Sequence, residues 1–448
     1  MALKMQRKIY QALLNWKNDS QKKPLMILGQ RQIGKTYIVR EFAKNEFQKL
    51  IELNFLTNES HHLFFQKLNG FDNLLNHLVN YFNLDINKLQ NYLFFFDEIQ
   101  ECPKAISALK MINESDLKIN LICSGSYLTY QIASTNFNFP VGQVQNLQMK
   151  QMMFDEFVIA LGKENLLNLA IESIKVKKEI APLIHQELLK WFDHYLRIGG
   201  FPEVVKTFIE QQYSYLKTYQ ILQQIQNHYK HDLYRYSDIF PSKHFLVKIY
   251  QKINQFLIRE NKKFVFQDLD HNAKYRELEK YLVWLDQSNL VIKIDNLKNI
   301  QYPLIDKVID NHFKIYYNDH GFLALDYQLN QQMDQEKFNL IKGALFENFV
   351  VSQLLDENKI YYYAFIEHGK RYEIDFVIQN EQNNPCLIEV KSSLQFKLTS
   401  LNKIKNYPYK FVLSTNNYQQ FANFVNIPIY LAFMLKEIIS SSELIKNE

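Results

Sequence analysis

One stretch near the start of the chain limits the possible folds more than any other. Residues 24–28 are an apolar run with the length of one buried strand, and residues 29–36 read Gly-Gln-Arg-Gln-Ile-Gly-Lys-Thr before a helical pattern begins at Tyr37. This is the Gly-x-x-x-x-Gly-Lys-Thr pattern of a phosphate-binding loop, or P-loop, between a strand and a helix. It predicts a parallel α/β domain that binds a nucleotide.

The residue types in this loop suit phosphate binding. Gly29 and Gly34 let the backbone turn its N–H groups onto an anion, because a side chain at either position would crowd the turn. Lys35 is expected to reach the β- and γ-phosphates of ATP, and the Thr36 hydroxyl to bind Mg²⁺. The predicted nucleotide-binding residues of the loop are Gly29, Gln30, Arg31, Gln32, Ile33, Gly34, Lys35 and Thr36.

A second chemical motif follows a buried strand. Residues 92–96 read Tyr-Leu-Phe-Phe-Phe and are followed by Asp97 and Glu98. We expect a buried parallel strand to deliver both carboxylates to the phosphate site, where Asp97 holds Mg²⁺ through its water shell and Glu98 polarises the attacking water. Ser126 follows the next predicted strand, at 118–123, and is either a polar group touching the γ-phosphate or an ordinary turn residue.

Length and composition set the frame for these motifs. A chain of 448 residues is too long for one ordinary core and predicts about two to four domains. The absence of a long apolar run and of an apolar signal core predicts a cytoplasmic protein without membrane contact. The scattered Cys102, Cys123 and Cys386 lack metal-ligand spacing and predict buried thiols in a reduced compartment. A net charge of +5 permits nucleic-acid binding without requiring it.

The middle of the chain is predicted to be mostly helical. Residues 158–236 show helical periodicity, broken at 198–202 by Ile-Gly-Gly-Phe-Pro, where glycine permits a turn and proline suits a first helical position. Residues 239–325 place two helical segments before a strand at 290–294, which matches the end of a winged helix. Its cations are either phosphate contacts or a solvated face: Arg259, Lys262, Lys263, Lys274, Arg276 and Lys280.

A second group of charged residues lies near the C-terminus. Glu347 falls in an apolar helical segment, Asp375 in a strand predicted at 372–378, and Glu389 and Lys391 in a strand predicted at 386–391. Strand alternation puts Glu389 and Lys391 on the same face of their strand. If Glu347, Asp375 and Glu389 face one point, they repel one another unless a cation joins them.

Several of these motifs together resemble those of a known family. They are the P-loop with Arg31-Gln32, Phe96-Asp97-Glu98-Ile99-Gln100, Ser124-Gly125-Ser126, Phe154-Asp155-Glu156-Phe157 and Gly199-Gly200-Phe201-Pro202-Glu203. They are similar to those of the two-part prokaryotic AAA+ ATPases. That family joins an ATPase core to a C-terminal domain of unknown function that is related to restriction endonucleases.

The resemblance implies an α/β multidomain protein. The implied parts are an AAA+ P-loop core with a parallel sheet at 1–157, a helical lid at 158–236, a winged-helix-like domain at 237–330 and a PD-(D/E)xK nuclease-like α/β domain at 331–448. The family usually carries an arginine where this chain has Gln143. A catalytic arginine must then come from Arg40, Arg197 or Arg235, or hydrolysis is slow.

The nuclease-like part of the resemblance implies roles for the C-terminal residues. Glu347, Asp375 and Glu389 would bind Mg²⁺ through their oxygens, and Lys391 would stabilise charge or help to generate hydroxide. His368 and Lys370 lie in the preceding turn and could contact phosphate. The catalytic residues implied for the whole chain are Glu98, Glu347, Asp375, Glu389 and Lys391.

Two functions fit these patterns. In the first, the chain is an ATPase that uses ATP and Mg²⁺ and couples hydrolysis to a nuclease-like domain acting on nucleic acid, with DNA as the expected partner. In the second, it is an ATP-switched regulator that binds DNA or protein, and its nuclease-like domain is catalytically inactive. The AAA+ resemblance also implies a ring or transient homo-oligomer, although the missing arginine at Gln143 weakens that implication.

Overall fold

The computed structural model describes residues 5–66, 70–126, 142–237, 240, 242–259, 262–271, 275–328, 335–354, 359–405 and 407–440. The chain divides into two compact units, which we call the N-terminal unit (residues 6–151) and the C-terminal unit (residues 152–286 and 290–448). The segments predicted as a helical lid and a winged helix therefore belong to the C-terminal unit. No helix in the described ranges is both long and apolar enough to cross a lipid bilayer.

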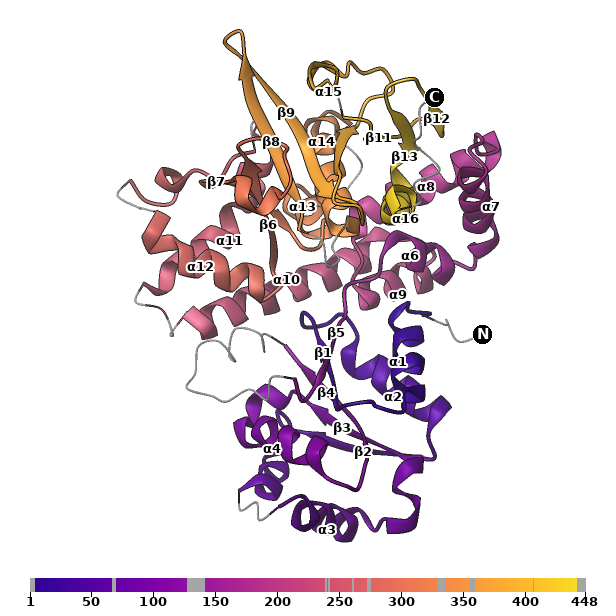
Figure 1. Cartoon of the computed structure of the whole chain (residues 1–448), viewed down its shortest axis with the longest axis vertical. Coiled ribbons are helices and arrows are strands. Elements are labelled where there is room, and N and C mark those ends of the chain that lie inside the picture. The colour runs from indigo at the N-terminus through magenta and orange to yellow at the C-terminus, as the bar shows by residue number, and fades with distance from the viewer. Residues whose placement is uncertain are drawn as a thin grey trace. The chain divides into compact units, whose positions relative to one another are not determined.

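The N-terminal unit is built around a parallel sheet, as the P-loop predicted (Figure 1). Its described strands lie in the order β2-β3-β4-β1-β5, and every neighbouring pair is parallel. The strands are β1 Leu25–Leu28, β2 Lys49–Asn54, β3 Tyr92–Asp97, β4 Asn120–Gly125 and β5 Gln145–Gln148.

Helices pack against this sheet and form its core. Phe94 and Phe96 alternate along β3 and are buried together with apolar side chains of α3 and α4. Gly70 has a φ of 95° immediately before α3 begins, a conformation that glycine adopts readily. The α-helices are α1 Ile9–Asn18, α2 Lys35–Glu46, α3 Phe71–Phe82 and α4 Pro103–Glu114, and short 3₁₀ turns cover Glu59–Phe65, Ile86–Asn91 and Ile99–Glu101.

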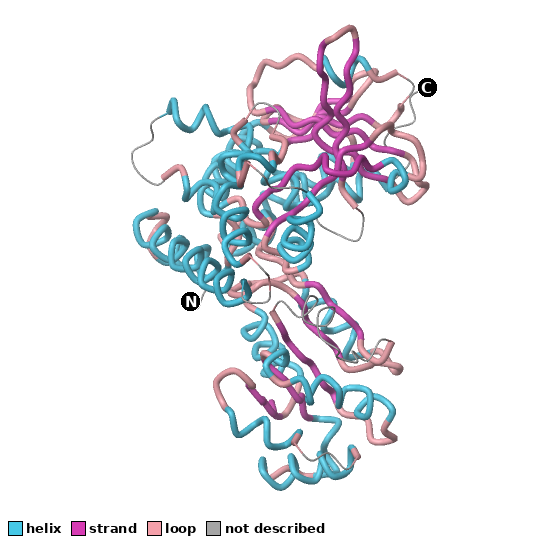
Figure 2. Tube along the Cα trace, turned by 90° about the vertical axis from the view of Figure 1, so that its left-hand side faces the viewer, coloured by secondary structure: helices cyan, strands magenta, loops and turns pink. Residues whose placement is uncertain are grey.

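The C-terminal unit begins with a run of helices that pack on a mixed sheet (Figure 2). The helical periodicity of the sequence predicted this run. The described α-helices of the whole C-terminal unit are α6 Phe154–Ala160, α7 Glu164–Lys175, α8 Pro182–Ile198, α9 Pro202–Glu210, α10 Tyr215–Ser237, α11 Lys243–Leu257, α12 Tyr275–Gln287, α13 Gly321–Asp326, α14 Gln335–Leu354, α15 Thr399–Lys403 and α16 Leu435–Ser440. Short 3₁₀ turns cover Phe266–Asp268, Leu304–Lys307 and Ile429–Met434.

The described strands of this unit form one sheet in the order β12-β13-β11-β10-β9-β8-β6-β7. The strand expected in the wing is β6, and it pairs with β7 on one side and with β8 on the other. One sheet therefore combines strands from before and after residue 330, where the sequence suggested a boundary between two domains. The strands are β6 Val291–Leu297, β7 Val308–Tyr317, β8 Tyr361–Glu367, β9 Lys370–Gln379, β10 Pro385–Lys391, β11 Lys410–Ser414, β12 Gln419–Gln420 and β13 Val425–Pro428.

The two glycines between α8 and α9 have a packing role. The Asp319 carboxylate accepts a hydrogen bond from the backbone N–H of Gly200 and one from that of Gly321, both at 2.8 Å. A Cβ on Gly199 would lie 1.9 Å from Asp319 Oδ1, and a Cβ on Gly200 would lie 2.1 Å from the backbone oxygen of Met152. Both positions thus require glycine because other parts of the same unit approach the backbone closely.

The three cysteines lie where their spacing predicted. Cys102, Cys123 and Cys386 are all buried and form no disulfide. Burial also raises the pKa of each thiol above its ordinary value, in agreement with inert packing residues.

Candidate functional site

The P-loop has the backbone geometry that its sequence requires. It leaves β1 after Leu28 and enters α2 at Lys35. Gly29 has a φ of 151°, and a Cβ there would lie 2.4 Å from the backbone oxygen of Met149. Gly34 adopts a left-handed conformation at φ 93° immediately before the helix. Both glycines are therefore needed for the shape of the loop.

The Lys35 side chain lies inside the loop. Its ammonium donates hydrogen bonds to the backbone oxygens of Gly29 (2.8 Å) and Gln30 (2.6 Å) and to Ser126 Oγ (2.8 Å). Burial lowers the pKa of Lys35 to about 8, although the carboxylates of Glu98 and Asp97 partly oppose this effect. A buried ammonium of this kind is stabilised by an anion. Ser126, which the sequence left open as a phosphate-sensing group, is a direct neighbour of Lys35.

Asp97 lies at the centre of a polar group at the end of β3. Its carboxylate accepts hydrogen bonds from Thr36 Oγ1 (3.0 Å), from Asn54 Nδ2 (3.0 Å) and from Ser124 Oγ. Burial raises the pKa of Asp97, and the hydrogen bond from Ser124 partly offsets that rise. The predicted Mg²⁺ ligands Thr36 and Asp97 are thus in contact. A magnesium ion would lower the cost of burying the Asp97 charge, so these residues fit the ion.

Glu98 follows Asp97 and is half-buried in a left-handed conformation with φ 51°. Its carboxylate accepts a hydrogen bond from Gln100 Nε2. Its charge raises the pKa of Lys35, so the two side chains interact electrostatically. The left-handed backbone at Glu98 is rare for a residue with a side chain, and such conformations cluster at functional sites.

Sequence reasoning missed several residues that shape this site. The buried Arg7 donates hydrogen bonds to the backbone oxygens of Ile33 (3.0 Å) and Lys150, and so ties the P-loop to the segment after β5. Nothing in the basic start of the chain singles out Arg7. Asn54 and Ser124 could have been found from the sequence, since each lies at the carboxyl end of a strand next to β3.

The three candidate catalytic arginines are placed differently. Arg40 makes a two-point ion pair with Glu52, at 2.9 and 2.7 Å, within the N-terminal unit. In the C-terminal unit, Arg197 is buried and ion-paired within α8, whereas Arg235 is exposed on α10. Gln143, at the position where the family usually has arginine, accepts a hydrogen bond from Asn113 Nδ2 at 2.6 Å.

The C-terminal unit holds the second predicted site. The helix α14 supplies Glu347, β9 supplies Asp375, and β10 supplies Glu389 and Lys391, as the sequence indicated. Asp375 accepts a hydrogen bond from the backbone N–H of Val390 at 2.7 Å, and Lys391 forms an ion pair with Glu389 at 2.5 Å. Glu389 Oε2 is buried and has no hydrogen-bond partner among the described residues.

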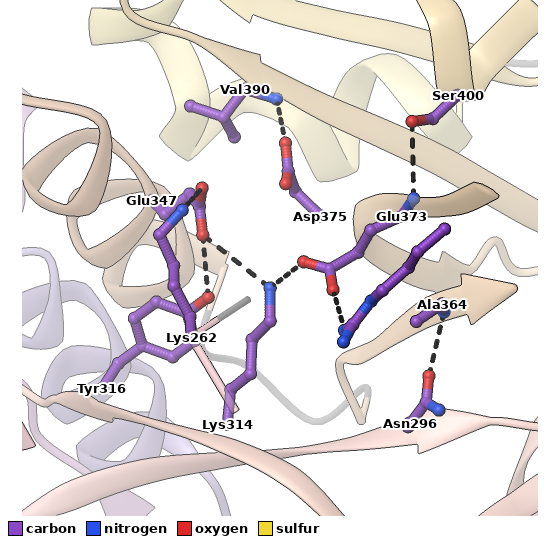
Figure 3. A network of polar contacts seen from close by, with 11 residues as sticks. Lys262, Asn296, Lys314, Tyr316, Glu347, Ala364, Glu373, Asp375, Val390 and Ser400 are labelled. Atoms are coloured by element: carbon purple, nitrogen blue, oxygen red, sulfur yellow. Dashed lines mark hydrogen bonds and ion pairs between the residues drawn. The ribbon is translucent and has the colours of Figure 1, made fainter. Parts of the chain in front are cut away.

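Two lysines from outside the predicted set also enter this site (Figure 3). Lys262 Nζ lies 2.5 Å from Glu347 Oε1, and Lys314 Nζ lies 4.0 Å from Glu347 Oε2. The Tyr316 hydroxyl donates a hydrogen bond of 3.0 Å to the same carboxylate. Burial alone would raise the pKa of Glu347, but the two lysines outweigh it and lower that pKa.

Lys314 links Glu347 to a further acid. Its side chain is fully buried on β7 and forms an ion pair with Glu373 of β9, which also pairs with Arg371 at 2.8 Å. Burial lowers the pKa of Lys314, but the carboxylates of Glu373, Glu347 and Asp375 outweigh it and raise that pKa. Sequence reasoning missed Lys314 because a lysine in a strand is ordinarily a surface residue.

These contacts bear on the predicted metal site. Burial raises the pKa of Asp375 to about 7, and the Glu347 and Glu389 carboxylates add to that rise, so the three acids are electrostatic neighbours. However, no group of three or more acidic, histidine or cysteine side chains in the described ranges is arranged to hold a metal ion. The predicted three-carboxylate site is therefore not assembled, because Lys262 and Lys314 already neutralise Glu347. Asp375 and Glu389 fit a cation better, since Glu389 has an unpaired oxygen.

The other predicted phosphate contacts have mixed positions. Arg259 forms an ion pair with Asp268, and Lys262 is directed to Glu347 as described above. Lys274 lies outside the described residues. His368 and Lys370 are exposed at the tip of the long β8–β9 hairpin seen in Figure 1.

Comparison with known families agrees with the first part of this description. Residues 21–158 match the family model of the AAA domain, and the parallel sheet and the P-loop geometry of this segment agree with that match. Residues 189–333 and 342–431 match two models that are each described as a domain of unknown function, DUF8612 and DUF4143. The nuclease-like resemblance has no counterpart among these matches.

Individual proteins show more distant likenesses. The uncharacterized protein MJ1544 of Methanocaldococcus jannaschii is 24% identical over 381 residues, which cover 82% of this chain and 74% of that protein. The Walker-type ATPase paby2304 of Pyrococcus abyssi is 13% identical, covers 72% of this chain and 95% of its own, and gives a TM-score of 0.44. Cdc6p of Pyrobaculum aerophilum is 15% identical, covers 74% and 92%, and gives 0.27. At these TM-scores neither structure decides a function for this chain.

Proposed function

We propose that the N-terminal unit binds ATP with Mg²⁺ and hydrolyses it. The observation that carries this proposal is the meeting of Lys35, Ser126 and the Thr36–Asp97 pair at the carboxyl ends of β1, β4 and β3. Ligands of parallel α/β sheets bind at this edge. Lys35 holds the β- and γ-phosphates, Ser126 senses the γ-phosphate, and Glu98 orients the attacking water.

Magnesium is part of this proposal. Thr36 and Asp97 would hold the ion, which would supply positive charge to offset the negative charge of the phosphates. The chain's own contribution is to keep Asp97 in place through Asn54 and Ser124, and to keep the P-loop in shape through Arg7.

We further propose that ATP hydrolysis is coupled to an action of the C-terminal unit on nucleic acid. Asp375, Glu389 and Lys391 are the residues that support a nuclease-like site, because they have the order and strand positions of that fold and Glu389 keeps an unpaired buried oxygen. The alternative is an ATP-switched regulator whose nuclease-like domain does not cut. The ion pairs of Glu347 with Lys262 and Lys314 favour this alternative.

Nucleotide assays test the first proposal. Lys35→Ala should abolish ATP binding in isothermal titration calorimetry, whereas Glu98→Gln should keep binding and lower turnover by about 10²–10⁴-fold. Lys110→Ala is the matched control, because Lys110 is an exposed lysine of the same unit. Normal turnover in both site variants would rule out the assignment.

Cleavage assays separate the two roles of the C-terminal unit. The intact protein is incubated with plasmid and oligonucleotide substrates and Mg²⁺ or Mn²⁺, in the presence of ATP, ADP or a non-hydrolysable analogue. Cleavage that disappears in an Asp375→Asn, Lys391→Ala variant supports the nuclease. If the protein cuts no substrate in any nucleotide state, the regulator is the better description.

A further inference from the structure

Two adjacent lysines of the C-terminal unit have different surroundings. Lys262 has a left-handed backbone with φ 45°, and its side chain contacts Glu347. The next residue, Lys263, is only half-buried. A backbone hydrogen bond of 3.2 Å from Phe264 N to Phe313 O holds this segment along β7. Lys262 therefore contacts the Glu347 carboxylate, and Lys263 lies half-buried beside β7.

The segment brings Lys263 close to two other basic residues. His312 precedes Lys314 by two positions on β7, so both side chains lie on one face, and His312 is exposed where Lys314 is buried. Burial lowers the pKa of Lys263, and the charge of Arg371 lowers it further. Burial, Lys263 and Arg371 likewise lower the pKa of His312. The Phe264–Phe313 hydrogen bond brings Lys263 next to His312, and Glu373 joins Arg371 to Lys314 of the same strand β7. We call Lys263, His312 and Arg371 the basic rim.

Arg371 connects the basic rim to the carboxylates. Arg371, Glu373 and Asp375 alternate along β9 and so share one face of the strand. One N–H of Arg371 contacts Glu373 at 2.8 Å, and the described residues leave other donors of the guanidinium for a ligand. Four residues of strand span about 13 Å, which is about four base steps of duplex DNA. A phosphate on Arg371 and one beside Asp375 would belong to nearby nucleotides.

We propose that Lys263, His312 and Arg371 bind the phosphate backbone of a nucleic-acid strand and lay it across the Asp375–Glu389 site. This inference rests on the proposed action of the C-terminal unit on nucleic acid. The Arg371 guanidinium, the Lys263 ammonium and the His312 imidazole can donate hydrogen bonds to the oxygens of a phosphodiester. The bound anion also reduces the electrostatic repulsion among these three basic groups. Lys262 does not take part, because it neutralises Glu347.

The experiment measures binding and its salt dependence. The full chain is titrated into a fluorescently labelled 20-nucleotide single strand or 20-bp duplex, and anisotropy is followed from 50 to 200 mM NaCl. A Lys263→Gln, His312→Gln, Arg371→Gln variant should weaken binding at least tenfold at 100 mM NaCl. Its plot of log affinity against log salt should become shallower by about 2, because two formal charges that contact phosphate are lost. Lys263→Gln alone should flatten it by about 1.

The control is a Lys178→Gln, Lys217→Gln variant. It removes two exposed charges from helical parts of the same unit, and its binding should stay within twofold of that of the unaltered protein. ATP turnover is measured on the same proteins without nucleic acid and should not change in any variant.

Three results would overturn the inference. If the rim variant binds like the control, the rim does not contact phosphate, although the nucleic-acid proposal survives. If polyglutamate competes as strongly as the oligonucleotides, the rim is an unspecific polyanion surface. If the unaltered protein binds neither oligonucleotide at 50 mM NaCl, the rim and the proposed action on nucleic acid both fail, while the turnover measurement judges the ATPase independently.

Discussion

The buried lysine of β7 offers the sharpest test of how the C-terminal unit is held together. Lys314→Met keeps most of the side-chain volume and removes the ammonium, whose side chain is 0% exposed. Removing one partner of a buried ion pair costs about 3–5 kcal/mol, because the remaining charge is left buried. In this variant Glu373 is still ion-paired with Arg371, and Glu347 is still ion-paired with Lys262. We therefore expect a loss at the lower end of that range, about 3 kcal/mol of unfolding free energy.

Urea unfolding followed by tryptophan fluorescence measures this loss. Trp191 and Trp284 are buried in the C-terminal unit, and a Trp16→Phe background removes the signal of the N-terminal unit. Lys217→Met, on an exposed position of α10, should change the unfolding free energy by less than about 0.5 kcal/mol.

A second substitution tests the cause of the loss. Adding Glu373→Gln to Lys314→Met should cost less than the sum of the single changes, because the acid left unpaired by the first change is removed by the second. The proposed role of Lys314 is wrong if Lys314→Met is as stable as Lys217→Met. It is also wrong if the losses of unfolding free energy from Lys314→Met and Glu373→Gln are additive.

Two further predictions concern the glycine junction of the same unit. Gly200→Ala should destabilise the protein by about 1–3 kcal/mol in urea unfolding, because its Cβ would lie 2.1 Å from the Met152 oxygen. Gly343→Ala is the control and should be neutral or slightly stabilising, since the nearest atom lies 3.9 Å away on an α-helix. Burial raises the pKa of Asp319 from 3.8 to about 7, so its contribution to stability should be fully present below about pH 4 and lost as the pH rises through 7. Urea midpoints between pH 4 and 8 should show this trend in the unaltered protein and lack it in Asp319→Asn; equal trends would contradict it.

The first unit was largely predictable from local patterns. Gly29, Gly34, Lys35 and Thr36 are close in sequence, and their spacing alone dictates a loop between a strand and a helix. The apolar run before Asp97 indicated a buried strand whose end meets that loop, and Thr36 indeed contacts Asp97. Local spacing carried no information on Arg7, which reaches the backbone of Ile33 from outside the motif.

The second site was predictable only in part. The positions of Asp375, Glu389 and Lys391 on strands followed from alternation, and the structure confirms these strands. The ion pair of Glu347 with Lys262 could not be predicted, because Lys262 lies 85 residues earlier in the chain and no local pattern links the two. The role of Glu347 as a metal ligand stays a prediction. The requirement for glycine at position 199 also depends on a residue that is distant in sequence, because a Cβ there would clash with Asp319.

The sequence by itself determined the class of the N-terminal unit, since phosphate binding depends on backbone shape and on neighbouring residues that a short motif specifies. Only the tertiary structure decided which charges meet in the C-terminal unit. Burial strengthens the ion pairs of Glu347 with Lys262 and of Lys314 with Glu373, and the partners come from α14, β7, β9 and the segment between α11 and α12. Whether those carboxylates face a metal ion or a lysine depends on how distant segments pack, and no short motif records that packing.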